Sequence, residues 1–349
     1  MSEPNTIQPA FHERNVPIFC SSSNQYSLYS WCMLHSLISH SSPEWNYDLF
    51  VLEENISQDR KDQLLGLAEG RSNVSVRIIN VARQLAGKEL HLEGGIARAT
   101  WYRILAPSIF SAYDKIIYLD LDIVACDDIA KLWQEDLGES WLAGCSDWAL
   151  YGTSGRDADY YLHDIGVAEL SQYVNGGVLI YNLHQMRQHG IEQKCLEVGV
   201  QKKFRLLDQD ALNHTCRGHV KLLDGKWNIF PARGYETSLP PEIYERWERT
   251  KKNAAILHYI GEKPWDNPRS DQAQLWWAHA RCSPSYEVML QNCTLNYAQD
   301  MADYARNRRL FFIYKLLSHL TFGALRLTLN DRKNALRYKI NRVRRLSER

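Results

Sequence analysis

The chain has 349 residues, of which 45% are hydrophobic and 23% charged, and a formal net charge of zero. This is the composition of a globular protein with one large or two ordinary domains. The eight cysteines form no CxxC pair and therefore indicate reduced thiols rather than a disulfide framework or a zinc site. The sequence contains no run of about 18 uncharged apolar residues, so no transmembrane helix is predicted. The polar segment 1–14 predicts a flexible N-terminus without a signal peptide.

The first part of the chain alternates between strand and helix patterns. Short apolar runs predict strands over 16–20, 48–52 and 74–79. Apolar residues at helical spacing predict helices over 26–40 and 59–69. This alternation is typical of a parallel α/β sheet.

The same kind of pattern continues to about residue 258. A helix is predicted over 96–105, a second begins at 209, and strands are predicted over 115–119, 141–145, 177–181 and 254–258. We therefore expect an α/β catalytic domain over 15–280, followed by a basic helical region over 281–349.

The neutral net charge hides a strongly basic C-terminal end. The last 46 residues contain 13 Lys and Arg against two acids, whereas the preceding 303 residues contain 28 bases and 39 acids. Leu336, Ile340 and Val343 recur among these bases at helical spacing, which predicts a basic amphipathic helix. Such a helix can bind an anionic membrane surface, or it can pack on the acidic domain. No nucleic-acid partner is expected, because no recognition module accompanies the charge.

Two acids follow the apolar strand predicted over 115–119. Asp120 and Asp122 flank Leu121 just beyond the carboxyl end of this strand, where open α/β sheets bind their ligands. Side chains at positions i and i+2 of an extended chain point to the same face, so the two carboxylates concentrate negative charge. Oxygen ligands of this kind suit Mg²⁺ or Mn²⁺ bridging phosphate oxygens. Taken alone, the triplet also fits two solvated loop acids.

A second group of polar residues follows the late apolar strand. His258 can complete the coordination of a metal such as Mn²⁺. Gly261 allows the backbone to approach a phosphate closely, and Lys263 supplies a point charge for a diphosphate. A single histidine at a strand end is often structural, so the interpretation depends on His258, Gly261 and Lys263 occurring together.

Two further motifs are weaker when each is taken alone. Asn175 and Gly176 lead into a predicted strand, and they also fit an ordinary turn. Asp208, Gln209 and Asp210 open a predicted helix, and they also fit an N-terminal cap.

Together these separated motifs resemble glycosyltransferase family 8, whose retaining enzymes include lipooligosaccharide galactosyltransferases, lipopolysaccharide-core glycosyltransferases and, more distantly, glycogenin. The likeness spans about 16–277. It implies a GT-A fold, which is a Rossmann-like nucleotide-binding mixed sheet flanked by helices, together with a UDP-sugar donor and Mn²⁺.

The resemblance also implies a role for individual residues. Asp120, Asp122 and His258 match the metal ligands, and the segment 23–28 matches the uridine-binding segment. In that segment Ser23 stands where relatives commonly have an acid, and Gln25 stands where they have Asn; Tyr26 follows. The remaining matches are Arg103, Asn175, Gly176, Asp208 and Gln209 near the donor sugar, Asp147 near the sugar and acceptor, and Gly261 and Lys263 at the diphosphate.

The resemblance implies a retaining transfer of galactose or glucose from a UDP-hexose to a saccharide or glycolipid acceptor. We expect a cytoplasmic enzyme, peripheral on the inner face of the cytoplasmic membrane. Retention by front-face attack is favoured over a covalent intermediate on Gln209 or Asp208, because an amide is a poor nucleophile. Two alternatives remain at this point: a haloacid-dehalogenase-like phosphatase using the segment from Asp120 to Val124, and a sugar-nucleotide-binding protein with a decayed site.

Overall fold

The computed structural model describes residues 6–84, 98–232, 234–320, 332–333 and 336. The chain divides into two compact units, Met1–Ile260 and Gly261–Arg349. The predicted domain limits at residues 15 and 280 stay predictions, and residues 1–5 of the predicted flexible N-terminus lie outside the described ranges.

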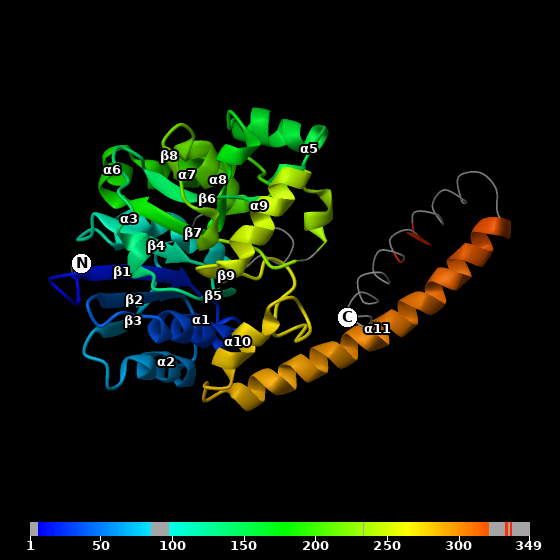
Figure 1. Cartoon of the computed structure of the whole chain (residues 1–349), viewed down its shortest axis with the longest axis horizontal. Coiled ribbons are helices and arrows are strands. Elements are labelled where there is room, and N and C mark those ends of the chain that lie inside the picture. Colours follow the sequence, from blue (N-terminus) through cyan, green and yellow to red (C-terminus); the bar gives the residue numbers. More distant parts are fainter. Residues whose placement is uncertain (1–5, 85–97, 233, 321–331, 334–335, 337–349) are drawn as a thin grey trace. The chain divides into compact units, whose positions relative to one another are not determined.

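The first unit is built on a seven-stranded sheet with the order β3-β2-β1-β4-β7-β6-β8 (Figure 1). Strands β3, β2, β1 and β4 run parallel to one another, and β6 is parallel to β8. Strand β7 runs antiparallel to both of its neighbours, β4 and β6. The bounds are β1 Asn15–Ser21, β2 Asn46–Glu53, β3 Val74–Asn80, β4 Lys115–Leu119, β6 Leu142–Ser146, β7 Val174–Asn182 and β8 Val220–Leu222. The predicted mixed α/β sheet is confirmed.

The central strands are buried on both faces, as their nearly continuous apolar runs require. The first unit contains helices α1 Ser27–Ser39, α2 Gln58–Leu65, α3 Ala106–Ile109, α4 Ala130–Trp133, α5 Arg156–Asp159, α6 Leu183–Gln188, α7 Ile191–Gln201, α8 Leu207–Cys216 and α9 Pro241–Lys252. A small antiparallel sheet pairs β5 Ile123–Ala125 with β9 Ile256–His258.

One face of the large sheet carries a row of aromatic side chains. The strand register places Phe50, Phe19 and Tyr118 on neighbouring strands, and all three are buried. The ring centroids of Phe19 and Tyr118 are 5.0 Å apart, and Phe110 lies 4.8 Å from Phe50. Such edge-on packing adds about 0.5–1.5 kcal/mol per pair beyond area burial. The row therefore fixes Tyr118, the last aromatic residue before the acidic motif.

The helix predicted over 96–105 needs a correction. Residues 98–105 form a 3-10 helix instead, and the short helix α3 follows it, while residues 96–97 lie outside the described ranges. The run contains Thr100, Trp101 and Ile104, whose branched or aromatic side chains lower α-helix propensity. Trp101 and Ile104 are also buried in the core, so tertiary packing decides the local geometry.

The second unit contains α10 Ala273–Ala280 and the long helix α11 Tyr286–Leu320. Trp265, Trp276 and Trp277 pack together with ring centroids 5.2 and 5.1 Å apart, and the Trp277 indole N–H donates to the Pro264 carbonyl over 3.0 Å. Among the described residues, no helix has the length and apolar character needed to cross a membrane. The amphipathic helix predicted around 336–343 lies outside the described ranges, apart from Leu336.

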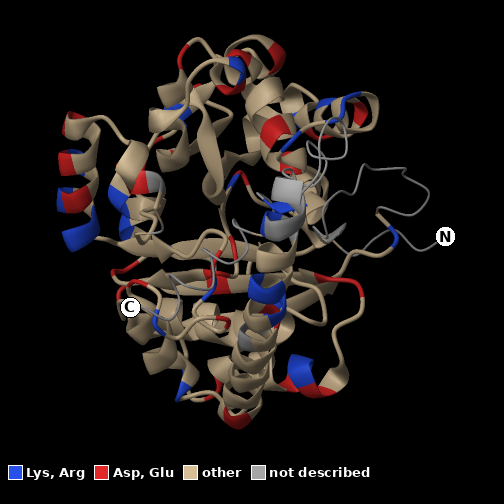
Figure 2. Cartoon of the chain, turned by 90° about the vertical axis from the view of Figure 1, so that its right-hand side faces the viewer, with Lys and Arg blue, Asp and Glu red and all other residues tan. Residues whose placement is uncertain are grey.

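Charge is divided along α11. Its basic residues Arg306, Arg308, Arg309 and Lys315 lie in the C-terminal half, whereas its acids precede residue 304. Figure 2 shows the chain with Lys and Arg in blue and Asp and Glu in red.

Candidate active site

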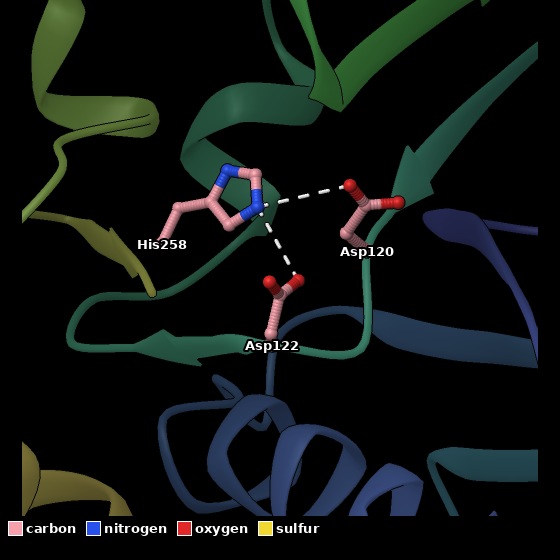
Figure 3. A group of neighbouring side chains, drawn as sticks. All are labelled: Asp120, Asp122 and His258. Carbon is pink, nitrogen blue, oxygen red and sulfur yellow. Dashed lines mark ion pairs between the residues drawn. The ribbon is translucent and has the colours of Figure 1, made fainter. Parts of the chain in front are cut away.

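Two strand ends and one short strand bring the acidic motif and His258 together. Asp120 directly follows β4, and its backbone N–H donates to the Gly177 carbonyl of β7 over 2.8 Å. Strand β5 then pairs with β9 so that Ile123 lies opposite His258. This register turns the imidazole toward both carboxylates (Figure 3).

The three side chains form a compact group of ligand atoms. The Nε2 atom of His258 lies 3.3 Å from Asp122 Oδ1 and 3.7 Å from Asp120 Oδ2. One ligand atom from each residue lies within 4.8 Å of the other two. The His258 side chain is 3% exposed, whereas Asp120 is 24% and Asp122 14% exposed, so the group opens on its carboxylate side. Two carboxylates and an imidazole fit a divalent cation such as Mn²⁺ or Mg²⁺.

The backbone at Gly177 leaves room for the imidazole. A Cβ atom at this position would lie 2.1 Å from His258 Cε1 and 2.6 Å from Nδ1. No side chain fits there, so the close approach of the histidine ring requires a glycine at the end of Asn175-Gly176-Gly177, the NGG motif.

The second carboxylate oxygen of Asp120 is held by the protein itself. The Tyr118 hydroxyl donates to Asp120 Oδ1 over 2.6 Å, and Arg103 Nη2 lies 3.1 Å from the same atom. Oδ2 is thereby left facing His258. Asp120 is therefore arranged to offer one oxygen to a cation.

Arg103 lies buried next to Asp120, one of the three residues of the candidate metal-ligand group Asp120, Asp122 and His258. Its Nε atom lies 2.7 Å from Asp208 Oδ2, and its Nη1 donates a short hydrogen bond to the Gly176 carbonyl. The guanidinium also stacks 4.3 Å from the Tyr118 ring centroid. Burial opposes the charge, but Asp120 and Asp208 together raise the pKa of Arg103. Burial also raises the pKa of Asp208 to about 6, although Arg103 acts in the opposite direction.

Gln209 and Asp147 meet at the amino end of β7. The Gly176 N–H donates to Gln209 Oε1 over 2.7 Å, and Asn175 Nδ2 donates to Asp147 Oδ2 over 3.0 Å. Gln209 Nε2 lies 3.4 Å from that same Asp147 oxygen and donates to the Tyr173 hydroxyl over 3.0 Å. Burial raises the pKa of Asp147, which lies just beyond β6.

The sequence interpretation missed two residues that hold this group in place, Asn228 and Tyr173. Asn228 contacts both Asn175 and His258, and its side chain is fully buried. Tyr173 joins Gln209 to the buried carboxylate of Asp210, which had been noted only as part of a helix start. No local pattern marks Asn228, because its partners lie 30 and 53 positions away.

The predicted uridine segment follows β1 at the same edge of the sheet. Ser23 Oγ accepts from the Tyr26 N–H over 3.4 Å, and the Ser23 carbonyl accepts from Ser27 N. Gln25 and Tyr26 are exposed, so both side chains are open to solvent. Strands β1 and β4 are parallel neighbours, so this segment and Asp120 leave the sheet at one edge.

Gly261 and Lys263 begin the second unit. Gly261 adopts a left-handed backbone with φ of 74°, which glycine favours, and the Lys263 carbonyl accepts from Asp266 N over 3.0 Å. Their predicted role at a diphosphate stays a prediction.

Known proteins are similar to this chain in sequence. The model of "Glycosyl transferase family 8" matches residues 17–268. General stress protein A of Bacillus subtilis is 26% identical over 259 residues, which cover 72% of this chain and 87% of that protein. A lipopolysaccharide 1,2-glucosyltransferase of Escherichia coli is 27% identical over 172 residues, which cover 47% and 49% of the two chains.

Solved structures share the fold. The galactosyltransferase LgtC, solved with donor and acceptor sugar analogues, is 25% identical with a TM-score of 0.65, covering 77% of this chain and 96% of that one. The bifunctional glycosyltransferase WbbM has a TM-score of 0.74 at 24% identity, and 82% of this chain matches 53% of it. These relatives confirm the predicted GT-A fold.

Proposed function

Because the chain belongs to glycosyltransferase family 8 and is a glycosyltransferase, we propose that it transfers galactose or glucose from a UDP-hexose to a saccharide acceptor, with retention at C1. The meeting of Asp120, Asp122 and His258 carries the proposal, because these side chains fit a divalent cation at the same edge of the sheet as the segment 23–28. The phosphatase alternative is set aside, because the family match covers the acidic motif.

The proposed cation is Mn²⁺, with Mg²⁺ as the alternative. Asp120 Oδ2, Asp122 Oδ1 and His258 Nε2 would hold it, since these atoms face one another. When bound, such a cation supplies Lewis-acid stabilisation of the departing diphosphate. We assign Gly261 and Lys263 to the same diphosphate, where the lysine adds positive charge.

The donor would lie along the carboxyl edge of β1 and β4. We assign Ser23, Gln25 and Tyr26 to the uridine. The backbone at Leu121, which lies between the two acids, is also assigned to the nucleotide. The donor hexose would contact Arg103, Asn175, Gly176, Asp208 and Gln209. Arg103 lies beside the other residues of this set, since it contacts Asp208 and the Gly176 carbonyl.

Front-face attack is the proposed route to retention. Gln209 Oε1 already accepts from the Gly176 N–H at 2.7 Å and lies 3.4 Å from Asn175 Nδ2, so its lone pairs are engaged. Asp208 is paired with Arg103. Neither group is free to attack C1, so Gln209 is assigned to orienting the reacting groups and Asp147 to the acceptor. A glycosyl adduct trapped on Gln209 or Asp208 would overturn this assignment.

The proposed acceptor is a surface glycan or glycolipid such as lipopolysaccharide or lipooligosaccharide. The support is similarity to a lipopolysaccharide glucosyltransferase and to LgtC. The basic half of α11 and the basic tail would then hold a cytoplasmic enzyme against the anionic inner face of the membrane.

The test is a panel of UDP-sugars assayed for Mn²⁺-dependent hydrolysis and transfer to oligosaccharide acceptors. Asp122→Asn should abolish turnover, whereas Asp127→Asn should retain it, because Asp127 pairs with Lys131 outside the ligand group. Full Mn²⁺-dependent transfer by Asp122→Asn would refute the metal site. UDP binding without any turnover would favour the decayed, non-catalytic alternative.

A further inference from the structure

The buried side chain of Asn228 lies behind the imidazole, on the side away from the two carboxylates. Its Oδ1 atom is 2.8 Å from His258 Nδ1, and its Nδ2 donates to Asn175 Oδ1 over 2.9 Å. The backbone fixes this position, because His258 N donates to the Ile229 carbonyl and Ile229 N to the Ile256 carbonyl. Residues 228–229 therefore run alongside β9.

A backbone N–H sets the direction of every bond in this chain of side chains. Gly177 N donates to Asn175 Oδ1 over 2.9 Å, and a backbone N–H can only donate. The Asn175 atom is therefore an oxygen, and the Asn228 atom facing it must be the NH₂ group. The other end of the Asn228 amide is then an oxygen, which can only accept a hydrogen bond from His258.

We infer that Asn228 is a positioning residue that keeps the proton of His258 on Nδ1 and leaves the Nε2 lone pair directed at the cation site. Figure 3 shows Nε2 on the edge facing Asp120 and Asp122, with the other ring nitrogen turned away. A histidine that ligates through one nitrogen needs an acceptor at the other to fix its tautomer and ring orientation. Here a neutral amide provides it, in place of a carboxylate.

The same chain of bonds joins the two halves of the site. Asn175 Nδ2 donates to Asp147 Oδ2 over 3.0 Å, so Asp147, Asn175, Asn228 and His258 form one continuous series. Asn228 thereby ties the metal-ligand side to the Asp147 side. The effect on metal binding rests on the proposed metal site. The tautomer of His258 does not, because it is set by the hydrogen bonds of the protein itself.

Two variants separate an acceptor role from simple packing. Asn228→Leu keeps the branched shape and the number of side-chain heavy atoms, although it is larger, and offers no acceptor, whereas Asn228→Asp keeps an oxygen opposite His258 Nδ1. Mn²⁺ affinity of the full-length metal-free protein is measured from the electron paramagnetic resonance signal of free Mn²⁺. Asn228→Leu should bind Mn²⁺ about 10–100-fold more weakly, and Asn228→Asp should remain within about threefold of the parent. Parent-like affinity in Asn228→Leu, or equal weakening in both variants, would overturn the inference.

A second measurement uses the parent protein and therefore does not depend on the folding of a variant at position 228. Long-range proton–nitrogen correlation spectra of the ¹⁵N-histidine-labelled, metal-free protein report whether His258 Nδ1 carries a proton, with His258→Gln used to assign the signal. A protonated Nδ1 is expected, and a bare Nδ1 would overturn the inference. If the parent and Asp122→Asn bind Mn²⁺ alike, the proposed metal site fails instead, and the tautomer is still decided by the spectrum.

Discussion

Replacing Gly177 with alanine tests the geometry of the proposed metal site through a single methyl group. The new Cβ would lie 2.1 Å from His258 Cε1, 2.6 Å from Nδ1 and 3.0 Å from Nε2. An ordinary contact begins near 3.4 Å, so the ring must move by about 1.3 Å or the strand must yield. The ring has little freedom, because Asn228 holds Nδ1 and the side chain is 3% exposed.

The expected magnitude follows from this displacement. Ligand distances in metal sites hold to about 0.2 Å, so a shift above 1 Å removes His258 from the ligand set. Losing a second-shell partner already costs about 10–100-fold in affinity, and losing the ligand itself should cost at least about 100-fold. Overpacking in a buried strand should also lower the free energy of unfolding by about 1–3 kcal/mol.

The control separates overpacking from loss of the ligand. Gly144→Ala would place a Cβ 2.9 Å from Leu179 and 3.0 Å from Val174, both apolar side chains of β7. It should show a similar loss of stability in thermal denaturation while keeping Mn²⁺ affinity. The reasoning would be refuted by a folded Gly177→Ala protein that binds Mn²⁺ as tightly as the parent, or by equal loss of affinity in both variants.

Three further changes test other parts of the structure. Tyr173→Phe removes the hydroxyl between Gln209 and Asp210; kcat should fall about tenfold with unchanged Mn²⁺ affinity, measured by steady-state kinetics and metal titration. Burial raises the pKa of Asp208 from 3.8 to about 6, so the folded state binds this proton more tightly. The free energy of unfolding should then fall by about 2 kcal/mol as pH rises from 4 to 6, a slope that chemical denaturation should find missing in Asp208→Asn. Truncation after residue 305 removes 13 basic residues and should abolish sedimentation with anionic liposomes; unchanged binding would contradict the membrane role.

The sequence predicted the parts of the site that lie in local motifs. Asp120 and Asp122 are recognisable because an apolar strand precedes them, and His258 because it ends another such strand. Asn228 could not be found in this way. Its function arises only when residues 228–229 pair with β9, and an asparagine after a tryptophan has no distinctive local pattern.

The reversed direction of β7 explains why these motifs meet. Asp120 and Asp147 leave the carboxyl ends of β4 and β6, whereas Asn175 and Gly177 lie at the amino end of β7. Because β7 runs antiparallel between the other two strands, its beginning lies beside their ends. A parallel strand in the same place would put the NGG motif at the opposite edge of the sheet.

The register between β4 and β7 determines that a glycine, Gly177, lies next to His258. The pairing of Leu119 with Val178 brings Gly177 beside Asp120, on the face where His258 approaches. A shift by one residue would turn the neighbouring side chains to the other face of the sheet. In the direction that brings Val178 beside Asp120, the Val178 side chain would then stand where the imidazole needs open space. The metal-ligand group therefore depends on strand direction and register as much as on the three ligands themselves.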